Sequence, residues 1–554
     1  MARTKKQIKD SGATFTPHLL ADYLARLISE HIKEGTSLSV LDPSCGEGAL
    51  LCAAHRIMGN IITEYVGYDT DAEYLEKSDI LLQSHDILAS LHNEDFLSSV
   101  SLPGELFESP INDSTDIVIA NPPYVRTQHL GTKIAQIIAK KFNLSGRVDL
   151  YYPFIIGMTQ ALKSGGILGV ITSNRYISNK SGADIREFLR RNYDILSVVD
   201  LGDTKLFNAA VLPAIFIGRK KTDPTQSTKN CHCLQVYKTE PITPCKFAES
   251  IYDVLTCQEP GIYCVGDNCY ELKEGKIHFP DDIKGCWEFT DDADQEWINT
   301  IRNSTAFYVG DKFKVKVGIK SCADNVFLNG NWDAEDSIPE DVLMRKMISQ
   351  DNIVRWRCDI DSCAKVLYPH YEHEGKKAVF DIEKFPLAKQ YLQKHQKQLS
   401  SREYLIKAGR NWYELWVPQD ARLWKYPKIV FPDISVSARF SYDDTGAIVN
   451  GNCYWITSES KEDINLLLLI EGVANSELME RYHSLCFNNK LYSGRKRYLS
   501  QYIEKYPIPN PNSVYSKEII ALVKELNASN SDDNIYGLES KINSLVYQAF
   551  GVKR

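Results

Sequence analysis

The sequence lacks any apolar segment long enough to cross a membrane. Its most apolar run, INLLLLI at residues 464–470, is too short to span a bilayer and is interpreted as a buried helix. The opening residues, MARTKKQIKDSG, have no apolar core of the kind that a secretory signal requires. We therefore expect a cytoplasmic protein.

Regular cysteine spacing is also missing. The fourteen cysteines are scattered along 554 residues, which is typical of reduced, buried thiols in a cytosolic protein and not of a disulfide framework. The cluster CHC at 231–233 is followed by no second ligand pair at zinc spacing, so we expect no metal site.

The composition is that of a globular protein, with 43% apolar and 25% charged residues. A chain of 554 residues is too long for one hydrophobic core, so we expect two domains, at 1–245 and 246–554. In the first, apolar runs suited to strands alternate with segments of helical spacing. The runs are LSVLDPS, YVGYDT, DIVIANPP, GILGVITS and ILSVVDLG. This alternation predicts a mostly parallel sheet with helices on both faces, followed by a hairpin formed by VLPAIFIGRK and CHCLQVYK.

Polar and glycine residues follow the ends of the early strands. The loop DPSCGEG at 42–48 contains neither the G-K-[ST] of a phosphate-binding loop nor the G-x-G-x-x-G of a dinucleotide site. Asp69 ends the next strand about twenty residues on, where such sheets place an acid that accepts both ribose hydroxyls. Asp95 and Phe96 follow the third strand and offer a carboxylate for an exocyclic amine and an aromatic face for a base. Together these residues predict a nucleoside pocket without a phosphate cradle.

The fourth strand ends abruptly in Asn121-Pro122-Pro123-Tyr124. Proline cannot donate to a sheet ladder, and it keeps the preceding residue extended, so the strand must stop here. Because ligands of parallel sheets bind beyond the carboxyl ends of the strands, this stiff, polar and aromatic segment should face the same site. A helix with apolar spacing is expected at 17–34, with Thr16 as its N-cap and Pro17 as its first residue.

These segments occur in the order shown by a known family. TP at 16–17, DPSCGEG, YDTD, EDF, ANPPY and FNAAVLPAIFI resemble the motifs of S-adenosylmethionine-dependent DNA adenine-N6 methyltransferases of the gamma group. The resemblance is strongest to TaqI-type modification methylases of prokaryotic restriction–modification systems, and its motifs cover residues 14–220. It implies a Rossmann-like methyltransferase domain with a mostly parallel seven-stranded sheet, S-adenosyl-L-methionine as cofactor and double-stranded DNA as substrate. A separately encoded restriction endonuclease and a monomeric enzyme are also expected.

The resemblance also implies roles for individual residues. Asn121 and the Pro122 carbonyl accept the two hydrogens of the target amine, Pro123 fixes their geometry, and Tyr124 stacks on the base. No strong general base is needed, because preorganised acceptors and positioning carry the reaction. The target atom lies inside a duplex, so the base must be rotated out. Phe207 matches the aromatic residue that stacks on the opposite face of this flipped base. Residues expected to hold the cofactor are Thr16, Pro17, Asp42, Ser44 and Gly46 at its methionine end, Asp69 at its ribose, and Asp95 and Phe96 at its adenine.

Two basic segments interrupt a chain whose net charge is −8. From Val125 to Val148 there is no acidic residue, and from Arg481 to Lys505 six basic residues face Glu504 alone. Either segment could be a solvated surface, but each is also suited to phosphates. The expected DNA-binding residues are Arg126, Lys140, Lys141, Arg147, Arg495, Lys496 and Arg497. In the second segment Tyr492 and Tyr498 are expected to interleave with the cations, and Ser493 and Gly494 indicate an exposed turn.

The second half loses the strand–helix alternation and is rich in tryptophan, so we expect a C-terminal α+β DNA target-recognition domain with a helical end from about Lys517. Its stretches FPDISVSARF and CFNNKLYSGRKRYLSQYIEKYPIPNP resemble the recognition domains of the same group. Base-edge contacts in the major groove would provide its specificity.

Three other functions fit part of the pattern. Protein glutamine-N5 methyltransferases share the motifs, but they are short chains without a second domain of this size. A modification subunit of a multi-subunit restriction or defence system would take its specificity from a partner, which the large second half makes unnecessary. A catalytically silent DNA-binding module would not need the intact segment from Asn121 to Tyr124.

Overall fold

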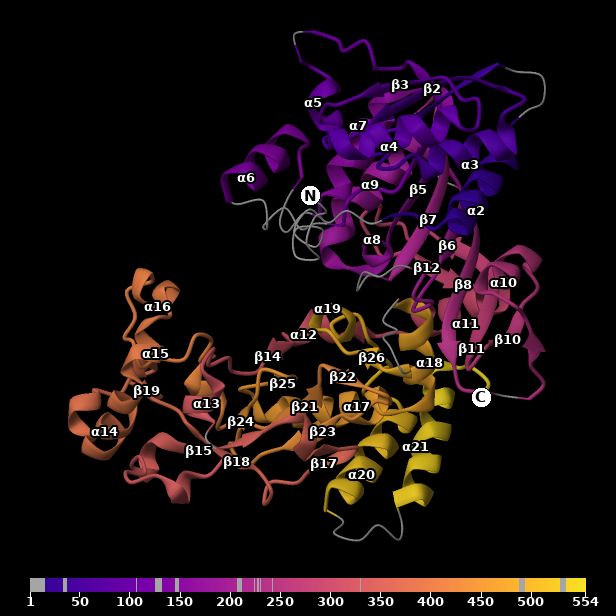
Figure 1. The fold of residues 1–554 in the computed structure, drawn as a ribbon. Helices are drawn as coiled ribbons and strands as arrows, with labels where there is room; N and C mark the ends of the chain where they lie inside the picture. Colours follow the sequence, from indigo (N-terminus) through magenta and orange to yellow (C-terminus); the bar gives the residue numbers. More distant parts are fainter. Residues whose placement is uncertain are drawn as a thin grey trace. The chain divides into compact units, whose positions relative to one another are not determined.

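The computed structural model describes residues 15–554 apart from 33–36, 106, 125–131, 145–148, 207–211, 224, 227–228, 230, 242, 329, 488–493 and 529–534. The chain divides into two compact units (Figure 1). The first runs to Ala293 and the second begins at Asp294, with short pieces on either side of residue 490 assigned to the first. No helix of the described residues is both long and apolar enough to cross a membrane.

One large sheet forms the centre of the first unit. Its strands are β1 (Leu38–Asp42), β2 (Ile62–Tyr68), β3 (Ala89–His92), β4 (Thr115–Ala120), β5 (Leu162–Ser173), β6 (Tyr193–Asp200), β7 (Pro213–Lys220), β8 (Cys231–Thr239), β9 (Lys246–Phe247), β10 (Gly261–Val265), β11 (Asn268–His278) and β12 (Glu288–Thr290). The order is β3-β2-β1-β4-β5-β7-β6-β8-β11-β10-β9, and β12 pairs with β11. Strands β1 to β5 are parallel, whereas β7 runs antiparallel to both β5 and β6.

Helices cover both faces of this sheet. One apolar core lies beneath α2 (His18–Ser29), α3 (Ala49–Met58), α4 (Ala72–Gln83) and α10 (Ile251–Cys257). A second core lies beneath α5 (Phe96–Ser99), α7 (Tyr151–Ala161), α8 (Arg175–Ser178) and α9 (Ala183–Asn192) on the other face. The layered α/β architecture is therefore confirmed. It brings the carboxyl ends of β1, β2 and β4 to one edge, where the candidate site lies.

Two details of the predicted sheet are wrong. Among the described residues the sheet has twelve strands and not seven. The expected hairpin of β7 and β8 does not form, because β7 lies between β5 and β6 while β8 pairs with β6 and β11. The first six residues of β7 are all buried, so a position with a partner strand on each side suits it better than a hairpin at the edge. Strands β9 to β12 continue the sheet, and the compact unit therefore extends to Ala293, beyond the boundary expected at 245.

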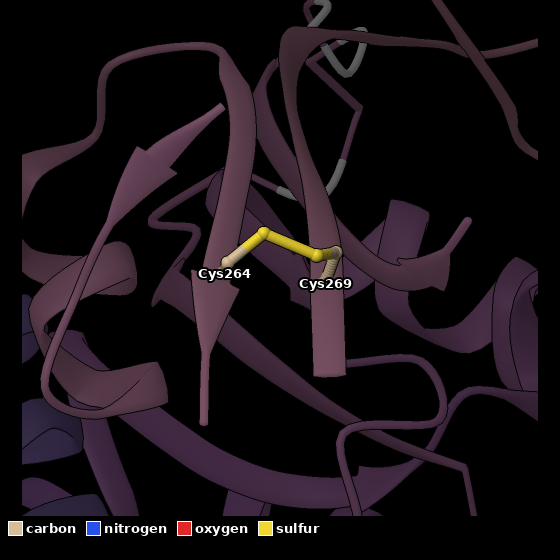
Figure 2. The surroundings of a disulfide bond; sticks show 2 residues. All are labelled: Cys264 and Cys269. Carbon is tan, nitrogen blue, oxygen red and sulfur yellow. A yellow bond between two sulfur atoms is a disulfide. The ribbon is translucent and has the colours of Figure 1, made fainter. Parts of the chain in front are cut away.

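The expectation that all fourteen cysteines are reduced is also wrong. Cys264 on β10 and Cys269 on β11 are directly paired across the hairpin and joined by a disulfide (Figure 2). The sequence offered no signal for this bond, because the two cysteines become neighbours only when the hairpin sets its register. The other twelve cysteines are free.

The second unit is an α+β structure. Its main sheet has the order β14 (Lys316–Val317), β25 (Cys453–Thr457), β21 (Lys428–Pro432), β23 (Ser441–Asp443), β17 (Trp356–Cys358) and β16 (Ile353–Val354). A smaller sheet has the order β18 (Ala364–Leu367), β15 (Met344–Ile348) and β24 (Ile448–Val449). Three two-stranded sheets pair β13 (Phe307–Tyr308) with β27 (Pro507–Ile508), β19 (His370–His373) with β20 (Lys376–Val379), and β22 (Ile434–Ser435) with β26 (Lys496–Arg497).

The helices of this unit include those predicted from the sequence. INLLLLI lies in α17 (Ile464–Ala474), whose last eight residues are all buried. The predicted helical end is confirmed as α20 (Val514–Ala528) and α21 (Ile535–Phe550), which pack together, and α20 also packs on α17 (Figure 1). The other helices from the end of the first unit onward are α11 (Asp292–Asn303), α12 (Val309–Lys312), α13 (Asp324–Phe327), α14 (Pro386–Lys394), α15 (Gln396–Ser400), α16 (Glu403–Lys407), α18 (Glu477–Cys486) and α19 (Ser500–Ile503).

Candidate functional site

The loop after β1 and the turn after β2 are joined through the Asp69 carboxylate. Its Oδ2 accepts a hydrogen bond of 2.9 Å from the Gly46 backbone N–H, and its Oδ1 accepts one of 2.9 Å from the Asp71 N–H. Gly46 has φ +51°, and a Cβ on it would meet nothing within 4 Å, so there is open space beside the loop. Each carboxylate oxygen retains acceptor capacity for a further donor. Asp69 can therefore hold the loop and still accept from a bound hydroxyl.

Asp42 lies at the end of β1 and is almost completely buried. Its Oδ1 accepts a hydrogen bond of 3.1 Å from the Ser44 backbone N–H. Its Oδ2 is buried with no hydrogen-bond partner among the described residues. Burial raises the pKa of Asp42 to about 8; the nearby Asp69 carboxylate adds to this rise, and the Ser44 hydrogen bond opposes it. A buried acceptor without a donor is costly, so this oxygen is suited to a cationic or hydrogen-bonding ligand.

The raised pKa of Asp42 predicts how stability depends on pH when no ligand is bound. From the ordinary value near 3.8 up to about 8 the folded chain keeps a proton that the unfolded chain releases. The contribution of Asp42 to stability should therefore be complete below pH 4 and fall as the pH rises to 8. Urea unfolding of wild type and Asp42→Asn over this range should show the variant gaining relative to wild type as the pH rises. A constant difference would mean that Asp42 is ionised in the folded protein.

Asp95 and Phe96 occupy positions that serve the fold. The Asp95 carboxylate is the N-cap of α5 and accepts from the Leu97 N–H at 3.1 Å and the Ser98 hydroxyl at 3.2 Å. It is exposed, so its remaining lone pairs are open to another donor. The Phe96 ring is 1% exposed and packs with Tyr68 and Phe154. The cofactor roles of both residues stay predictions.

Asn121 follows β4 directly, and its side-chain amide is held from two sides. Its Nδ2 donates to Thr16 Oγ1 at 2.9 Å, and its Oδ1 accepts from the Tyr124 hydroxyl at 2.7 Å. The amide is thereby oriented with its oxygen toward Tyr124. Because the Thr16 hydroxyl is used in this contact, it does not cap the helix, and α2 begins at His18 with Pro17 in the N-cap position. The predicted N-cap at Thr16 is wrong by one residue. The contact between Thr16 and Asn121 was not predicted.

The remaining candidates of the Asn121 segment lie close by in the chain. Pro122 is buried, and Pro123 and Tyr124 are partly exposed. Loss of water around the Tyr124 hydroxyl raises the pKa of this group well above its ordinary value, so it stays protonated and can donate. The structure brings Thr16, Asn121 and Tyr124 together, and it brings Asp42, Ser44, Gly46 and Asp69 together in the adjoining loops. Phe207 lies outside the described residues.

The candidate DNA-binding residues differ in what they contact. Arg126 and Arg147 lie outside the described residues. On α6 (Thr132–Lys141), Lys140 is exposed, whereas the Lys141 ammonium donates to the Leu97 carbonyl at 2.9 Å and the Val100 carbonyl at 3.4 Å. Lys141 therefore ties α6 to the end of α5, as a cation near a helix C-terminus commonly does.

The basic segment of the second unit is less uniform than its sequence indicated. Arg495 is exposed, Lys496 is half-buried, and Arg497 lies 3.9 Å from an Asp433 carboxylate oxygen. Tyr492 lies outside the described residues, and the prediction that Tyr498 interleaves with exposed cations is wrong. Its ring is 2% exposed and stacks on His483 at 4.6 Å, because the strand β26 before it runs along β22 and turns this side chain inward.

Two family models match the chain. The model described as "Eco57I restriction-modification methylase" matches residues 67–207, and "TaqI-like C-terminal specificity domain" matches residues 374–508. The type II methyltransferase M.BanIII of Aneurinibacillus aneurinilyticus is 42% identical, over 99% of this chain and 98% of that protein. M.BstVI of Geobacillus stearothermophilus is 25% identical, over 94% of each. Among solved structures, the type IIG restriction endonuclease BpuSI matches at 16% identity and a TM-score of 0.38, over 97% of this chain and 66% of that one.

The layered sheet, the family match and the full-length relative thus define a Rossmann-like methyltransferase, a class whose cofactor is S-adenosyl-L-methionine. With a full-length relative at 42% identity, the chain belongs to the type II DNA methyltransferases of restriction–modification systems, of the TaqI type. It is a site-specific DNA methyltransferase. The Asp42 oxygen, which has no hydrogen-bond partner in the described part of the chain, and the open space at Gly46 fit the cofactor, which supplies an activated methyl group on a positively charged sulfur.

Proposed function

We propose that this enzyme methylates the N6 amino group of an adenine that it rotates out of double-stranded DNA. The observation that carries the proposal is the orientation of the Asn121 amide by Thr16 and Tyr124. An exocyclic amine is a weak nucleophile, because its lone pair is delocalised into the ring. The Asn121 oxygen and the Pro122 carbonyl would each accept one of its hydrogens, and acceptors fixed before the reaction stabilise the charge that develops.

Tyr124 has two parts in this proposal. Without DNA its hydroxyl donates to the Asn121 oxygen at 2.7 Å. A carbonyl oxygen has two lone pairs, so a target amine can share this acceptor or displace the hydroxyl from it. The ring then stacks on the base, and Phe207 is proposed for the opposite face. Pro123 would keep the ring and the acceptors in register.

Mapping the modified base in DNA methylated by the purified protein tests this assignment. Digestion of the DNA to nucleosides and mass spectrometry should show N6-methyladenine, and methylation-sensitive sequencing should place it at one short recognition sequence. A methyl group on cytosine N4 would overturn the choice of adenine while leaving the amine chemistry intact.

For the cofactor we propose that Asp69 holds the ribose and that Asp42, with Ser44, Gly46, Thr16 and Pro17, borders the methionine end. Asp42 would lie near the positive charge of the ligand, which would favour its ionised form. Asp95 and Phe96 are proposed for the adenine.

The ribose role predicts that Asp69→Ala weakens S-adenosylmethionine binding by roughly 2–3 kcal/mol, about 30- to 150-fold, the scale of hydrogen bonds to a charged group. Titration calorimetry measures the change. Asp79→Ala is the matched control, because Asp79 is exposed on α4 and its carboxylate accepts from Gln83, one turn along the helix. Unchanged affinity of Asp69→Ala would remove Asp69 from the ribose role.

Rotation of the base predicts a preference for weakened pairs. A duplex with a mismatch opposite the target adenine should bind more tightly than the intact site, because part of the unpairing cost, a few kcal/mol, is already met. Fluorescence anisotropy with the two duplexes at one salt concentration makes the comparison. Equal affinities would argue that the enzyme does not extrude the base.

The division of labour is proposed to follow the two units. Methyl transfer would lie in the unit that ends at Ala293, and site recognition in the unit that begins at Asp294. Arg126, Lys140, Arg147, Arg495, Lys496 and Arg497 are proposed phosphate contacts, with a weaker case for Lys141. We also propose a cytoplasmic enzyme that acts as a monomer and protects host DNA from a separately encoded endonuclease.

A further inference from the structure

A short loop in the second unit is fixed at its base and open at its tip. The loop follows β22 and comprises residues 436–439, in the stretch FPDISVSARF. The strand that enters the loop, β22, pairs with β26, so that Ile434 lies opposite Arg497 and Ser435 lies opposite Lys496. The pairing joins two stretches that are more than 50 residues apart in the sequence, and it places the loop beside the basic segment that begins at Arg495.

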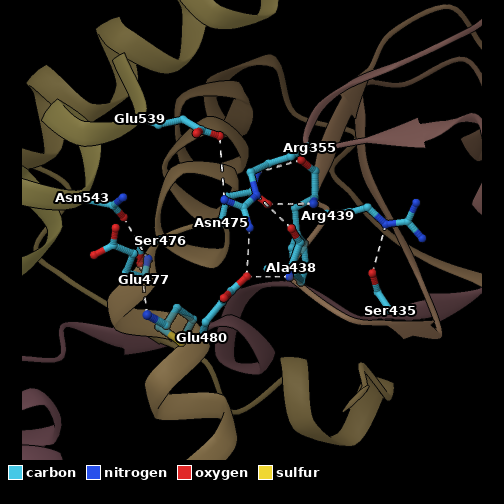
Figure 3. Close-up of polar contacts among 12 residues, drawn as sticks. Arg355, Ser435, Ala438, Arg439, Asn475, Ser476, Glu477, Glu480, Glu539 and Asn543 are labelled. Atoms are coloured by element: carbon cyan, nitrogen blue, oxygen red, sulfur yellow. Dashed lines mark hydrogen bonds and ion pairs between the residues drawn. The ribbon is translucent and has the colours of Figure 1, made fainter. Parts of the chain in front are cut away.

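The far end of the loop is held through its backbone. The Ala438 N–H donates to Glu480 Oε1 at 2.7 Å, and the Ala438 carbonyl accepts from Arg355 Nε at 3.1 Å (Figure 3). Arg355 and Glu480 also form an ion pair of 2.9 Å with each other. Both polar groups of one loop residue are thus satisfied by side chains from other elements, and Ala438 itself is 1% exposed.

Two further contacts close the loop. The Asn475 side chain accepts from the Phe440 N–H at 2.9 Å and donates to the Phe440 carbonyl at 2.8 Å, as a neighbouring strand would. The Arg439 guanidinium donates from Nε to Ser435 Oγ at 3.0 Å (Figure 3). It also donates from Nη1 to the Ile353 carbonyl at 3.0 Å. The segment that leaves the loop is therefore hydrogen-bonded to the strand that enters it.

The tip is open to solvent despite this support. Val436 is 65% exposed, while Ala438 and Phe440 on the same stretch are buried. Single exposed apolar residues are common on surfaces. What sets this one apart is its place on a loop with fixed ends beside a basic strand, since base recognition needs side chains presented without a large ordering cost.

We infer that residues 436–439 form a base-contacting loop of the recognition unit, with Val436 against an apolar base edge such as a thymine methyl group and Ser437 in reach of a polar edge. This inference rests on the proposed recognition role of the second unit and assigns it to particular residues. Arg495 beside the loop contacts phosphate, which positions the loop but carries no sequence information. Arg355, Glu480 and Asn475 are positioning residues that keep the loop in one shape.

The test is a selectivity profile of Val436→Ala in the full-length enzyme. Methylation rates are measured on the recognition site and on duplexes that differ from it by one base pair at each position. We expect discrimination to fall roughly tenfold at one position, the scale of one apolar base contact, and to stay at wild-type values elsewhere. Val342→Ala is the matched control, because Val342 is 58% exposed on a different segment of the same unit.

Arg495→Ala separates the two kinds of contact. It should weaken binding to all duplexes alike and reduce the slope of log affinity against log salt by about one. The inference would be overturned if Val436→Ala and Ser437→Ala both kept the wild-type selectivity profile and melting temperature. The loop would then contact a protein or have no binding role. That result would not affect the proposed methylation of adenine, because wild-type activity and the modified base are measured in the same assays.

Discussion

Replacing Asn121 by alanine should lower the rate of methyl transfer at least a hundredfold while cofactor affinity stays near wild type. The Asn121 side chain donates to Thr16 and accepts from Tyr124, so its oxygen has a fixed position before any base arrives. Removing a single preorganised group of this kind commonly costs on the order of a hundredfold or more in rate. Single-turnover kinetics with saturating DNA and cofactor measure the chemical step alone.

Two comparisons make the result specific to the amide. Asn299→Ala removes an exposed asparagine from α11 and should leave the rate unchanged. Calorimetry on Asn121→Ala should give wild-type affinity for the cofactor, because none of the proposed cofactor contacts is an Asn121 atom. A variant that methylates DNA at near wild-type rate would show that Asn121 is not the acceptor.

The sequence allowed the candidate site to be proposed, because its residues lie at strand ends. Asp42 ends β1, while Asp69 and Asn121 directly follow β2 and β4, and parallel strands bring such ends to one edge. What could not be predicted was which side chain meets which. Thr16 was assigned to a helix cap from local preference, and its contact with Asn121 joins residues 105 positions apart. Local propensity contains no information on such a contact.

Strand pairing in the rest of the chain was predicted less well for the same reason. β7 and β8 are neighbours in sequence and both have the composition of strands, yet each pairs with other partners. The sequence identified the basic run at 495–497 as a candidate DNA-binding surface. It did not indicate the pairing of this run with β22 or the inward orientation of Tyr498. In the sequence, residues 436–439 were noted only as part of FPDISVSARF, which resembles the recognition domains of this group. Its function could be inferred only when Arg355 and Glu480 were seen to hold it.

A buried ion pair in the second unit gives the largest expected effect on stability. Lys428 on β21 and Asp443 on β23 are directly opposite across the sheet, and both side chains are 0% exposed. Replacing one partner leaves the other charge without compensation in a low-dielectric interior. We expect Lys428→Met to lower the free energy of unfolding of this unit by about 3–5 kcal/mol.

Tryptophan fluorescence in a urea titration reports this change, because Trp287 is the only tryptophan before Ala293 and the other seven lie in the second unit. Lys407→Met is the matched control. It breaks an ion pair with Glu403 whose side chains are 76% and 75% exposed, and it should change stability by less than about 1 kcal/mol. The double variant Lys428→Met/Asp443→Leu should recover much of the loss, because it leaves no charge buried alone. If the double variant is as unstable as Lys428→Met, the cost comes from packing around β21 and not from the stranded Asp443 carboxylate.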